Sequence, residues 1–596
     1  MMMWYISWFL SVFTLLAALF LAWFCSKKRD AKVKPLYALF MGVFLSSVFL
    51  IYPIYREAFK GDLAATFKAL IISAQNTIQF FTADSDYGLI SDNITGLSGW
   101  IRDAYALLGT VLIILAPVLT FGFVMSFFKG ITAQLKYMFH AAADTYVFSE
   151  INQNTVSLAE SIRTDNPKAI IIFTNAPHEE EQIDDDLLDR VNRLIAICYK
   201  QDISLVKIKP GRSNQKTFFF ALCEDESQSL SEVLQLIPKY RNRVNTIIYL
   251  FSTSMESELL LTNLDKGSLI IRRINPLTSF VNYVLSTQGD LLFTSAIDGG
   301  SNSKEISALI LGAGQLGTEM LKALTWYCQM DNYRFSANAF DIDESCKDRI
   351  AAQCPELLDE KYNGILVEGE AFYKIGIHAC DVNTESFKKK VREIGNISYA
   401  FVSLGNDSLN ISTAVNLRIL FEQMRIHPVI MCVVSDPEKC AALTGVKDKN
   451  GTPYDIQFLG DAKTIYSASV IINPALESEA LELHKRYNNG DPYGFYEYEY
   501  NYKSSMASVI HFEARKNRQI TGAGKADADL TEIERETIES LEHRRWNAYM
   551  RSEGFIYSGS KDKKSRNDLG KMHHNLVEYD ELSDDDKRKD SRVGTK

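Results

Sequence analysis

Three long apolar segments near the N-terminus constrain this chain more than any other feature. They cover residues 4–24, 36–54 and 104–128, and tryptophans lie near both ends of the first. A helix of about 20 residues crosses the hydrocarbon core of a bilayer. The sequence therefore predicts a transmembrane domain of three spans over residues 1–130, with the lipid bilayer as its partner.

The charges that flank the first segment predict its orientation. No Lys or Arg precedes the segment, which argues against a cleavable signal peptide. Five basic residues follow it instead: Lys27, Lys28, Arg29, Lys32 and Lys34. By the positive-inside rule this loop is cytoplasmic. We therefore expect a multi-pass protein of the cell inner membrane, with its N-terminus outside, residues 56–103 external and the later domains cytoplasmic.

Cysteine placement and net charge narrow the function classes. None of the nine cysteines lies in the external segment, and no Cys-x-x-Cys spacing occurs. The sequence therefore predicts neither a metal site nor a redox pair. The net charge of −10 argues against broad nucleic-acid binding.

The external segment has a helical pattern of its own. Leu63, Phe67, Leu70, Ile71 and Ile78 recur at near-helical spacing. We expect short helices that either lie at the bilayer surface or line a vestibule. A later Tyr-Gly pair lacks the preceding Thr-Val-Gly of a potassium filter, which argues against a potassium-selective pore.

From about residue 146 the chain alternates apolar runs with helical patterns, which predicts the α/β class with parallel sheets. A first domain is expected over residues 140–297. Its strands are predicted at 146–148, 169–173, 203–208, 217–222, 246–251 and 269–271, and its helices include 155–163 and 187–201. Its first turn contains no glycine, so this Rossmann-like domain has either lost dinucleotide binding or binds something else.

A second series is expected over residues 305–490, with strands at 306–311, 337–340, 399–404 and 429–434. The first of these strands leads into Gly312, Gly314, Gln315, Leu316 and Gly317, and an apolar-periodic helix follows. In this arrangement the glycines allow a tight turn and bring a phosphate to a helix N-terminus.

Two further polar clusters follow strands of the same sheet. Asp341 and Asp343 end the second strand, where an acid normally takes the ribose hydroxyls. Gly405, Asn406 and Asp407 follow the third strand at the same carboxyl edge. The sequence predicts that this edge binds NAD or another adenine nucleotide of the ATP, ADP or ADP-ribose type, as a ligand and not as a redox cofactor.

These clusters, together with Asn410, resemble the nucleotide-binding domain of Trk-type potassium-transport regulators, the RCK or TrkA-N module. The resemblance covers roughly residues 305–490, including the later run 458–462. It implies a domain that binds NAD, ATP or ADP and moves a membrane gate. Asn406 stands where an acid is common in that family. Residues 515–529 are polar and contain glycine, which predicts a linker after this domain.

The C-terminal segment begins with a predicted capping box, Thr531 to Glu534. Glu542, Trp546 and Tyr549 then share one helix face. A lysine-rich loop follows the helix. An exposed aromatic ring can stack on adenine while nearby cations hold phosphates. The alternative is that Trp546 serves only as the core residue of a small helical unit.

This segment, residues 531–596, resembles the ryanodine-receptor repeat (RyR) domain in the order and spacing of its motifs. The motifs are residues 542–546, 554–557, 576–582 and 587–590. The resemblance implies a sensor for nucleotides or their derivatives. The residues it assigns to messenger binding are Glu542, His543, Arg545, Trp546, Tyr557 and Lys571.

The combined features predict a membrane effector gated by a nucleotide-derived signalling molecule, in the setting of prokaryotic antiviral defence. Three spans cannot enclose a wide pore alone, so a homo-oligomer is expected. No catalytic acid–base pair follows the second sheet, so no enzyme is expected. Two alternatives stay open: a housekeeping nucleotide-regulated ion channel or transporter subunit, and a membrane-bound NAD-dependent enzyme.

Overall fold

The computed structural model describes most of the chain and separates it into two compact units, Met1–Phe139 and His140–Lys596. The described residues are 2–27, 35–59, 61, 63–82, 84, 87–97, 99–128, 137, 143–176, 184–209, 215–262, 264–300, 303–363, 373–472, 474–520 and 522–591. The basic cluster at 28–34, on which the predicted orientation depends, lies outside them.

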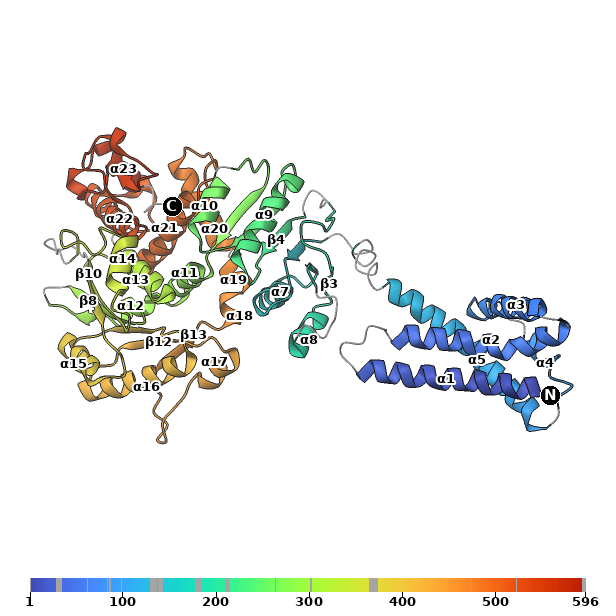
Figure 1. The fold of residues 1–596 in the computed structure, drawn as a ribbon. Helices are drawn as coiled ribbons and strands as arrows, with labels where there is room; N and C mark the ends of the chain where they lie inside the picture. The colour runs from blue at the N-terminus through green and yellow to red at the C-terminus, as the bar shows by residue number, and fades with distance from the viewer. Residues whose placement is uncertain are drawn as a thin grey trace. The chain divides into compact units, whose positions relative to one another are not determined.

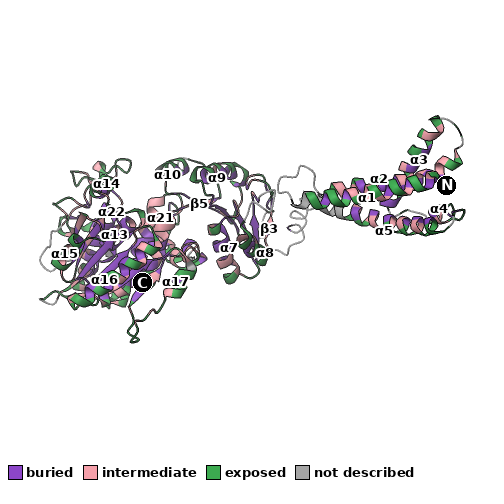
Figure 2. Cartoon of the chain, turned by 60° about the horizontal axis from the view of Figure 1, so that its bottom comes forward, coloured by how far each residue is buried: buried purple, intermediate pink, exposed green. Residues whose placement is uncertain are grey.

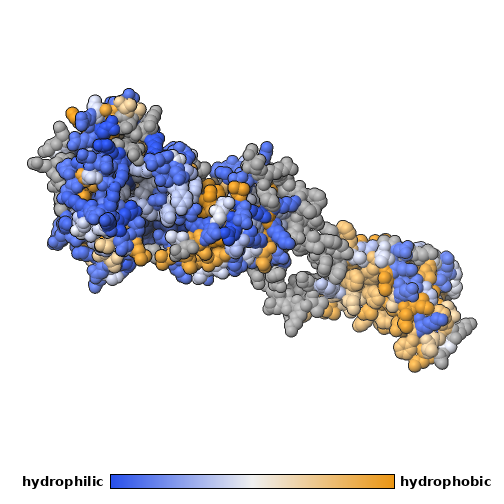
Figure 3. Space-filling view, turned by 90° about the horizontal axis from the view of Figure 1, so that it is seen from above, coloured by the Kyte–Doolittle hydropathy of each residue, from blue (hydrophilic) through white to orange (hydrophobic). Residues whose placement is uncertain are grey.

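The first unit is a helical bundle. Its helices are α1 (Met2–Lys27), α2 (Pro35–Ala58), α3 (Leu63–Phe81), α4 (Gly88–Ser91) and α5 (Trp100–Phe128) (Figure 1). Three of them, α1, α2 and α5, are long and apolar enough to cross a membrane. Hydrophobic residues cover much of the visible bundle surface (Figure 3). These helices agree with the three predicted spans, and the helical spacing of the external segment is confirmed by α3.

Small residues bring α1 and α2 together. Ser11 Oγ donates a hydrogen bond to the Ser46 carbonyl at 2.7 Å, and Ser7 Oγ donates to the Phe49 carbonyl. A side chain added at Gly42 would place its Cβ only 2.0 Å from that of Ala18. Close approach through small residues is how helices associate where lipid removes the hydrophobic driving force.

The second unit begins with a six-stranded parallel sheet in the order β3-β2-β1-β4-β5-β6. Its strands are β1 (Thr145–Phe148), β2 (Ile170–Phe173), β3 (Ile197–Cys198), β4 (Thr217–Ala221), β5 (Thr246–Phe251) and β6 (Ile270–Ile274). Its helices are α7 (Gln153–Asp165), α8 (Asp185–Arg193), α9 (Glu226–Tyr240) and α10 (Met255–Thr262). The next two helices, α11 (Pro276–Gln288) and α12 (Asp290–Thr294), pack into the core of the second sheet. The strands are buried almost throughout (Figure 2) and most are apolar runs, as is typical of parallel strands covered on both faces; β6 is the exception, with Arg272 and Arg273 in its middle.

A second sheet has the order β10-β9-β8-β11-β12-β13, with β7 antiparallel to β8. Its strands are β7 (Ile297–Asp298), β8 (Lys304–Leu311), β9 (Tyr333–Asp341), β10 (Tyr373–Ala379), β11 (Tyr399–Val402), β12 (Val429–Val433) and β13 (Ile456–Leu459). Its helices are α13 (Gln315–Tyr327), α14 (Cys346–Gln353), α15 (Glu385–Ile394), α16 (Asp407–Met424) and α17 (Pro437–Leu443). The strand order reverses between β1 and β4 in the first sheet and between β8 and β11 in the second. Open α/β sheets bind ligands at such a point.

The remaining helices tie the unit together. They are α18 (Ala462–Ile465), α19 (Ala468–Ile471), α20 (Pro474–Tyr487), α21 (Glu499–Asn517), α22 (Glu532–Ser552) and α23 (Asp584–Ser591), with a short pair β14 (Ile556–Tyr557) and β15 (Met572–His573). α19 packs into the core of the first sheet, and α22 packs into the core of the second. The predicted capping box of Thr531 and Glu534 is confirmed at the start of α22.

Residues 203–208 do not form the strand that their apolar alternation predicted. They form an irregular turn whose carbonyls accept hydrogen bonds from side chains of α9. Lys239 Nζ lies 2.8 Å from the Val206 carbonyl, and the Tyr240 hydroxyl donates to the same carbonyl at 3.1 Å. The pattern correctly indicated burial, but side chains and not a neighbouring strand satisfy the backbone.

Two boundaries also differ from the prediction. The helix predicted over 187–201 ends at Arg193, because Ile195 has a positive φ of 53° and the chain then enters β3. The predicted linker 515–529 begins inside α21, because the Arg515 side chain is fully buried in the unit.

Candidate functional site

The glycine loop joins β8 to α13 at the carboxyl edge of the second sheet. A Cβ at Gly312 would lie 2.3 Å from the Ser403 carbonyl, and one at Gly317 would lie 1.8 Å from the Gly312 carbonyl. A Cβ at Gly314 would meet no atom within 4 Å. The fold therefore requires the outer two glycines, whereas Gly314 borders open space in front of the helix.

The first residues of α13 face that space. Gly314 is the N-cap, and Gln315 and Leu316 begin the helix. The first backbone N–H groups of a helix have no partner within it, and the helix dipole adds partial positive charge there. This end of α13 is thus suited to an anion such as a phosphate.

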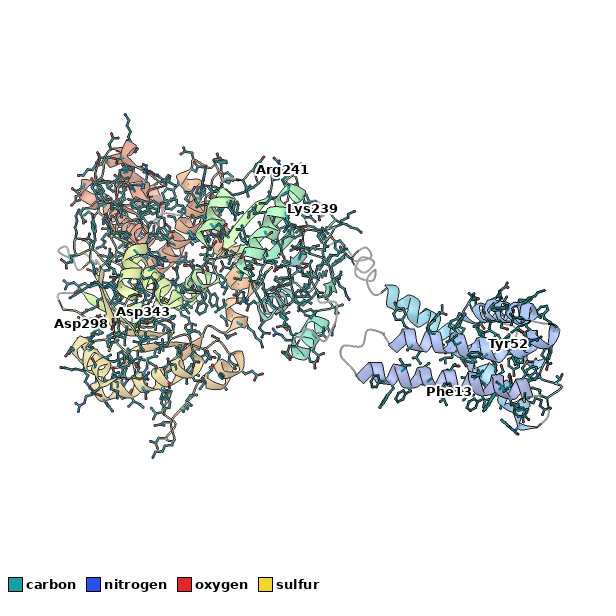
Figure 4. All side chains as sticks on the ribbon, in the orientation of Figure 1. Phe13, Tyr52, Lys239, Arg241, Asp298 and Asp343 are labelled. Atoms are coloured by element: carbon teal, nitrogen blue, oxygen red, sulfur yellow. The ribbon has the colours of Figure 1, made fainter. Side chains whose placement is uncertain are left out.

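Asp341 and Asp343 meet at this loop, but the protein itself occupies much of their hydrogen-bonding capacity. Asp341 accepts from the Ala313 N–H at 2.6 Å and from the Asp343 N–H at 2.9 Å. Arg349 donates to Asp343 at 2.6 Å and to the Ala313 carbonyl at 3.0 Å. Hydrogen bonds from Ser345, with Arg349 as a further cause, hold the pKa of Asp343 below its usual value. Asp343 is labelled in Figure 4.

Arg349 was missed in the sequence because it follows the motif by a full helix turn of α14. Its hydrogen bond to the Ala313 carbonyl places a cation beside the glycine loop.

The third predicted cluster has structural roles. Asn406 caps α16 by accepting from the Leu409 N–H at 3.1 Å. Asp407 accepts from the backbone N–H groups of Ser435 and Asp436, at 2.8 and 3.0 Å, and so joins the ends of β11 and β12. Gly405 has a φ of 80°, which favours glycine. The turn lies next to the glycine loop through the contact of Ser403 with Gly312.

A separate cavity of about 680 Å³ lies between the α20–α21 region and the C-terminal segment. Figure 1 shows α21, α22 and α23, in orange to red, gathered beside α13 and α14. Four of the six predicted messenger-binding residues line this cavity: Glu542, His543, Arg545 and Trp546. Its volume is in the range of small-molecule sites, about 300–1,000 Å³.

Aromatic rings form much of the cavity wall. Trp546 is half-buried and packs edge-to-face on His573, with ring centroids 4.9 Å apart. Tyr493 and Tyr498 are largely exposed and line the opposite side, from the stretch between α20 and α21. The sequence analysis did not select this stretch. Its signal was visible as a run of tyrosines over residues 487–502.

A buried ion cluster lies next to the cavity, which Asp586 and Asp590 also line. Glu542 accepts from Arg545 Nε and Nη2 at 3.0 and 2.8 Å, and its other partner is the Arg515 guanidinium at 3.7 Å. All three side chains are at most 2% exposed. Within the described residues, no nitrogen of Arg515 forms a hydrogen bond, nor does Arg545 Nη1. One carboxylate therefore faces two guanidinium groups.

Three histidines lie on or near the cavity. Burial lowers the pKa of His573 to about 3, and burial also lowers the pKa of His574. His574 is 5% exposed and lines the cavity, yet neither ring nitrogen has a hydrogen-bond partner among the described residues. His543 lies 2.9 Å from the Val577 carbonyl and 3.3 Å from Asp590. Unpartnered buried nitrogens are costly, so the site is suited to a ligand that hydrogen-bonds there.

The other two predicted residues lie away from the cavity lining. The Tyr557 N–H donates to Glu356 at 2.8 Å, and Lys571 Nζ donates to the Glu553 carbonyl at 2.8 Å. The Tyr557 contact fastens the C-terminal segment to the rest of the unit, whereas the Lys571 contact lies within the segment. At the rim, Lys563 and Arg566 supply the cations that the sequence analysis assigned to Lys571.

The comparisons with known proteins assign no family. No family model matches the chain, and no curated protein matches it. The described structure defines the class: an α/β protein with three N-terminal helices long and apolar enough to cross a membrane and with two parallel sheets.

Proposed function

We propose that the protein is a membrane effector controlled by a nucleotide-derived signalling molecule, acting in prokaryotic antiviral defence. The C-terminal segment is the messenger sensor and resembles an RyR domain, while the second sheet is an RCK-like domain that binds an adenine nucleotide. Several copies assemble in the inner membrane with their N-termini outside. Messenger binding then rearranges the soluble unit and permeabilises the bilayer.

The cavity is the observation that carries this proposal. Its lining combines aromatic rings, which stack on a base, with the cations Lys563 and Arg566, which attract phosphates. The unbonded guanidinium nitrogens of Arg515 beside Glu542 and the unpartnered ring nitrogens of His574 favour a ligand with hydrogen-bond acceptors. The same chain carries the membrane helices, so binding and membrane activity are joined covalently.

A buried charge cluster gives the two nucleotide sites a physical connection. Thr278 of α11 donates to Glu319 at 3.0 Å, and Glu319 pairs with Lys322 at 2.9 Å, both on α13. Lys322 lies 3.7 Å from Glu553 at the end of α22. The helix that starts at the glycine loop is thereby paired with the helix that lines the cavity.

Calorimetry on the full chain in detergent micelles tests the proposal with ATP, NAD and ADP-ribose as probes. Trp546→Ala should weaken binding of the active probe about 5- to 150-fold, because one base–aromatic stack contributes about 1–3 kcal/mol. Tyr493→Ala should weaken it too. Tyr557→Ala is the matched control, since Tyr557 does not line the cavity. Circular dichroism must show that each variant is folded.

Dye release from liposomes connects binding to function. The Trp546→Ala chain should need a correspondingly higher probe concentration for release. If this folded variant binds and responds like the parent, the messenger binds elsewhere, and Gly314→Val then tests the glycine loop. Failure of all three probes to bind the parent chain would refute an adenine nucleotide as the signal.

A further inference from the structure

The charged side chains that line the cavity are sorted by their exposure. Three of them are exposed, and all three are cations: Lys563, Arg566 and Lys589. The acids of the lining lie deeper, because Glu542 and Asp586 are buried and Asp590 is half-buried. Arg545 is buried as well, but it is paired with Glu542. A ligand therefore meets positive charge at the opening of the cavity and acceptor groups farther in.

Asp586 of α23 gives the buried wall an acceptor of fixed charge. Its side chain belongs to a residue that is only 7% exposed. Burial raises the pKa of Asp586, but hydrogen bonds from Lys589 and Ser583 lower it overall, to about 2. The carboxylate is therefore ionised at neutral pH and accepts hydrogen bonds without donating any. Lys589 and Ser583 each use one of its about four acceptor sites, so it keeps capacity for a ligand.

His574 adds a donor and a second acceptor to this wall. It is 5% exposed and stacks on His573, with ring centroids 4.7 Å apart. Burial lowers the pKa of His574, and the nearby Asp586 carboxylate counteracts this shift only in part. The ring is therefore neutral and carries one N–H donor and one acceptor nitrogen. Neither nitrogen has a hydrogen-bond partner among the described residues, and such buried groups are costly unless a ligand binds them.

An amino-substituted base matches these two side chains. Adenine presents an amino group that donates hydrogen bonds, and a ring nitrogen beside it that accepts. An ionised carboxylate pairs with the amino group, but it repels a carbonyl oxygen placed at the same point. The buried wall is therefore suited to distinguish adenine from hypoxanthine, which has a carbonyl oxygen in place of the amino group.

We propose that the cavity binds the adenosine diphosphate unit of its ligand with the base at the buried wall and the diphosphate at the opening. Asp586 accepts from the base amino group, His574 donates to the ring nitrogen beside it, and Lys563 contacts the diphosphate. ATP, NAD and ADP-ribose share this unit, and the group by which they differ extends toward solvent. This inference rests on the proposed function, and it names the part of the nucleotide that the cavity recognises.

Calorimetry with adenosine, inosine and ADP tests the base assignment on the full chain in detergent. Every chain also carries Gly314→Val, so that nucleotide at the glycine loop does not contribute. Adenosine should bind about 10- to 100-fold more tightly than inosine, because inosine places a carbonyl oxygen against Asp586. Equal affinities would overturn the recognition of the amino group. This comparison leaves the cavity residues unchanged, so it does not depend on the folding of a cavity variant.

Asp586→Asn tests which side chain reads the base. An amide both donates and accepts, so it can also pair with the carbonyl oxygen of inosine. The preference for adenosine over inosine should therefore fall about tenfold. Asp585→Asn, an exposed acid outside the cavity lining, is the matched control and should keep the preference. An unchanged preference in a folded Asp586→Asn chain would overturn the role of Asp586.

Lys563→Ala tests the position of the diphosphate. It should weaken ADP binding about two- to fivefold and leave adenosine binding unchanged, because an exposed charge acts on the diphosphate alone. Lys564→Ala, the exposed neighbour outside the lining, should change neither. If Lys563→Ala leaves ADP binding unchanged, or weakens adenosine equally, the diphosphate does not lie at the opening. Failure of both ADP and adenosine to bind would refute the proposed messenger sensor, whereas binding without these preferences refutes only the orientation.

Discussion

Replacing Glu542 by Gln tests the buried charge network beside the cavity. The Glu542 carboxylate is 2% exposed and is the acid that the buried guanidinium groups of Arg545 and Arg515 share. Gln keeps the size of the side chain but removes its charge. Two desolvated guanidinium groups would then face each other without a carboxylate between them.

The cost follows from breaking a buried ion pair, which is about 3–5 kcal/mol when one partner is removed. Unfolding entropy is about 2.1 cal/mol/K per residue, or roughly 1 kcal/mol/K for a unit the size of His140–Lys596. The melting temperature of the soluble unit should therefore fall by about 3–5 °C. Differential scanning calorimetry of the full chain in detergent measures it.

Glu513→Gln is the matched control on the neighbouring helix α21. Glu513 pairs with Lys516 at the surface, with both side chains more than 40% exposed. Exposed pairs contribute about 0–1 kcal/mol, so this variant should melt within about 1 °C of the parent. If Glu542→Gln melts no lower than Glu513→Gln, the guanidinium groups of Arg515 and Arg545 are not buried against this carboxylate.

Further outcomes follow from the loop, the histidines and the bundle. Gly317→Ala should lower the melting temperature because its Cβ would overlap the Gly312 carbonyl. Gly314→Val should leave the melting temperature unchanged but abolish nucleotide binding at the loop. Equal melting temperatures for the two variants would contradict this geometry. His573 is protonated more readily in the unfolded chain, so stability should be lost as pH falls below about 6.5, by up to about 1.4 kcal/mol per pH unit. In His573→Asn the contribution of His573 to the dependence of stability on pH should vanish. A dependence identical to that of the parent chain would refute a lowered pKa for His573. In intact cells an impermeant thiol reagent should label Thr95→Cys but not Asn450→Cys; the reverse pattern would invert the proposed topology.

The sequence was most informative where one physical requirement dominates a segment. Apolar length alone identified α1, α2 and α5, and continuous apolar runs identified most strands of both sheets. The glycine spacing located the loop before α13. Residues 203–208 show the limit of such patterns. The pattern predicted which side chains are buried, but it could not predict whether a strand or side chains would hydrogen-bond the backbone.

Only one of the two walls of the candidate cavity could be predicted from the sequence, because the other wall comes from a distant part of the chain. Its C-terminal wall includes Glu542 and Trp546, which the sequence analysis selected from one helix face. Its other wall comes from Tyr493 and Tyr498, some 50 residues earlier in the chain. Lys571 does not line the cavity, and the sequence could not show that its ammonium group donates to the Glu553 carbonyl. Pairing across such distances depends on tertiary packing.

The position of Glu553 gives the strongest reason to treat the two ligand sites as one system. Coupling between sites requires an element whose equilibrium both ligands bias. α22 contacts both candidate sites: its side lines the cavity, and Glu553, which directly follows it, lies 3.7 Å from Lys322 of α13. Burial raises the pKa of Glu553, but Lys322 and Lys503 lower it overall, so the carboxylate is charged within a ring of lysines. A shift of α22 on ligand binding would move this charge against Lys322 on α13, the helix that begins at the glycine loop. A nucleotide at that loop and a messenger in the cavity would then change each other's affinity by the same factor.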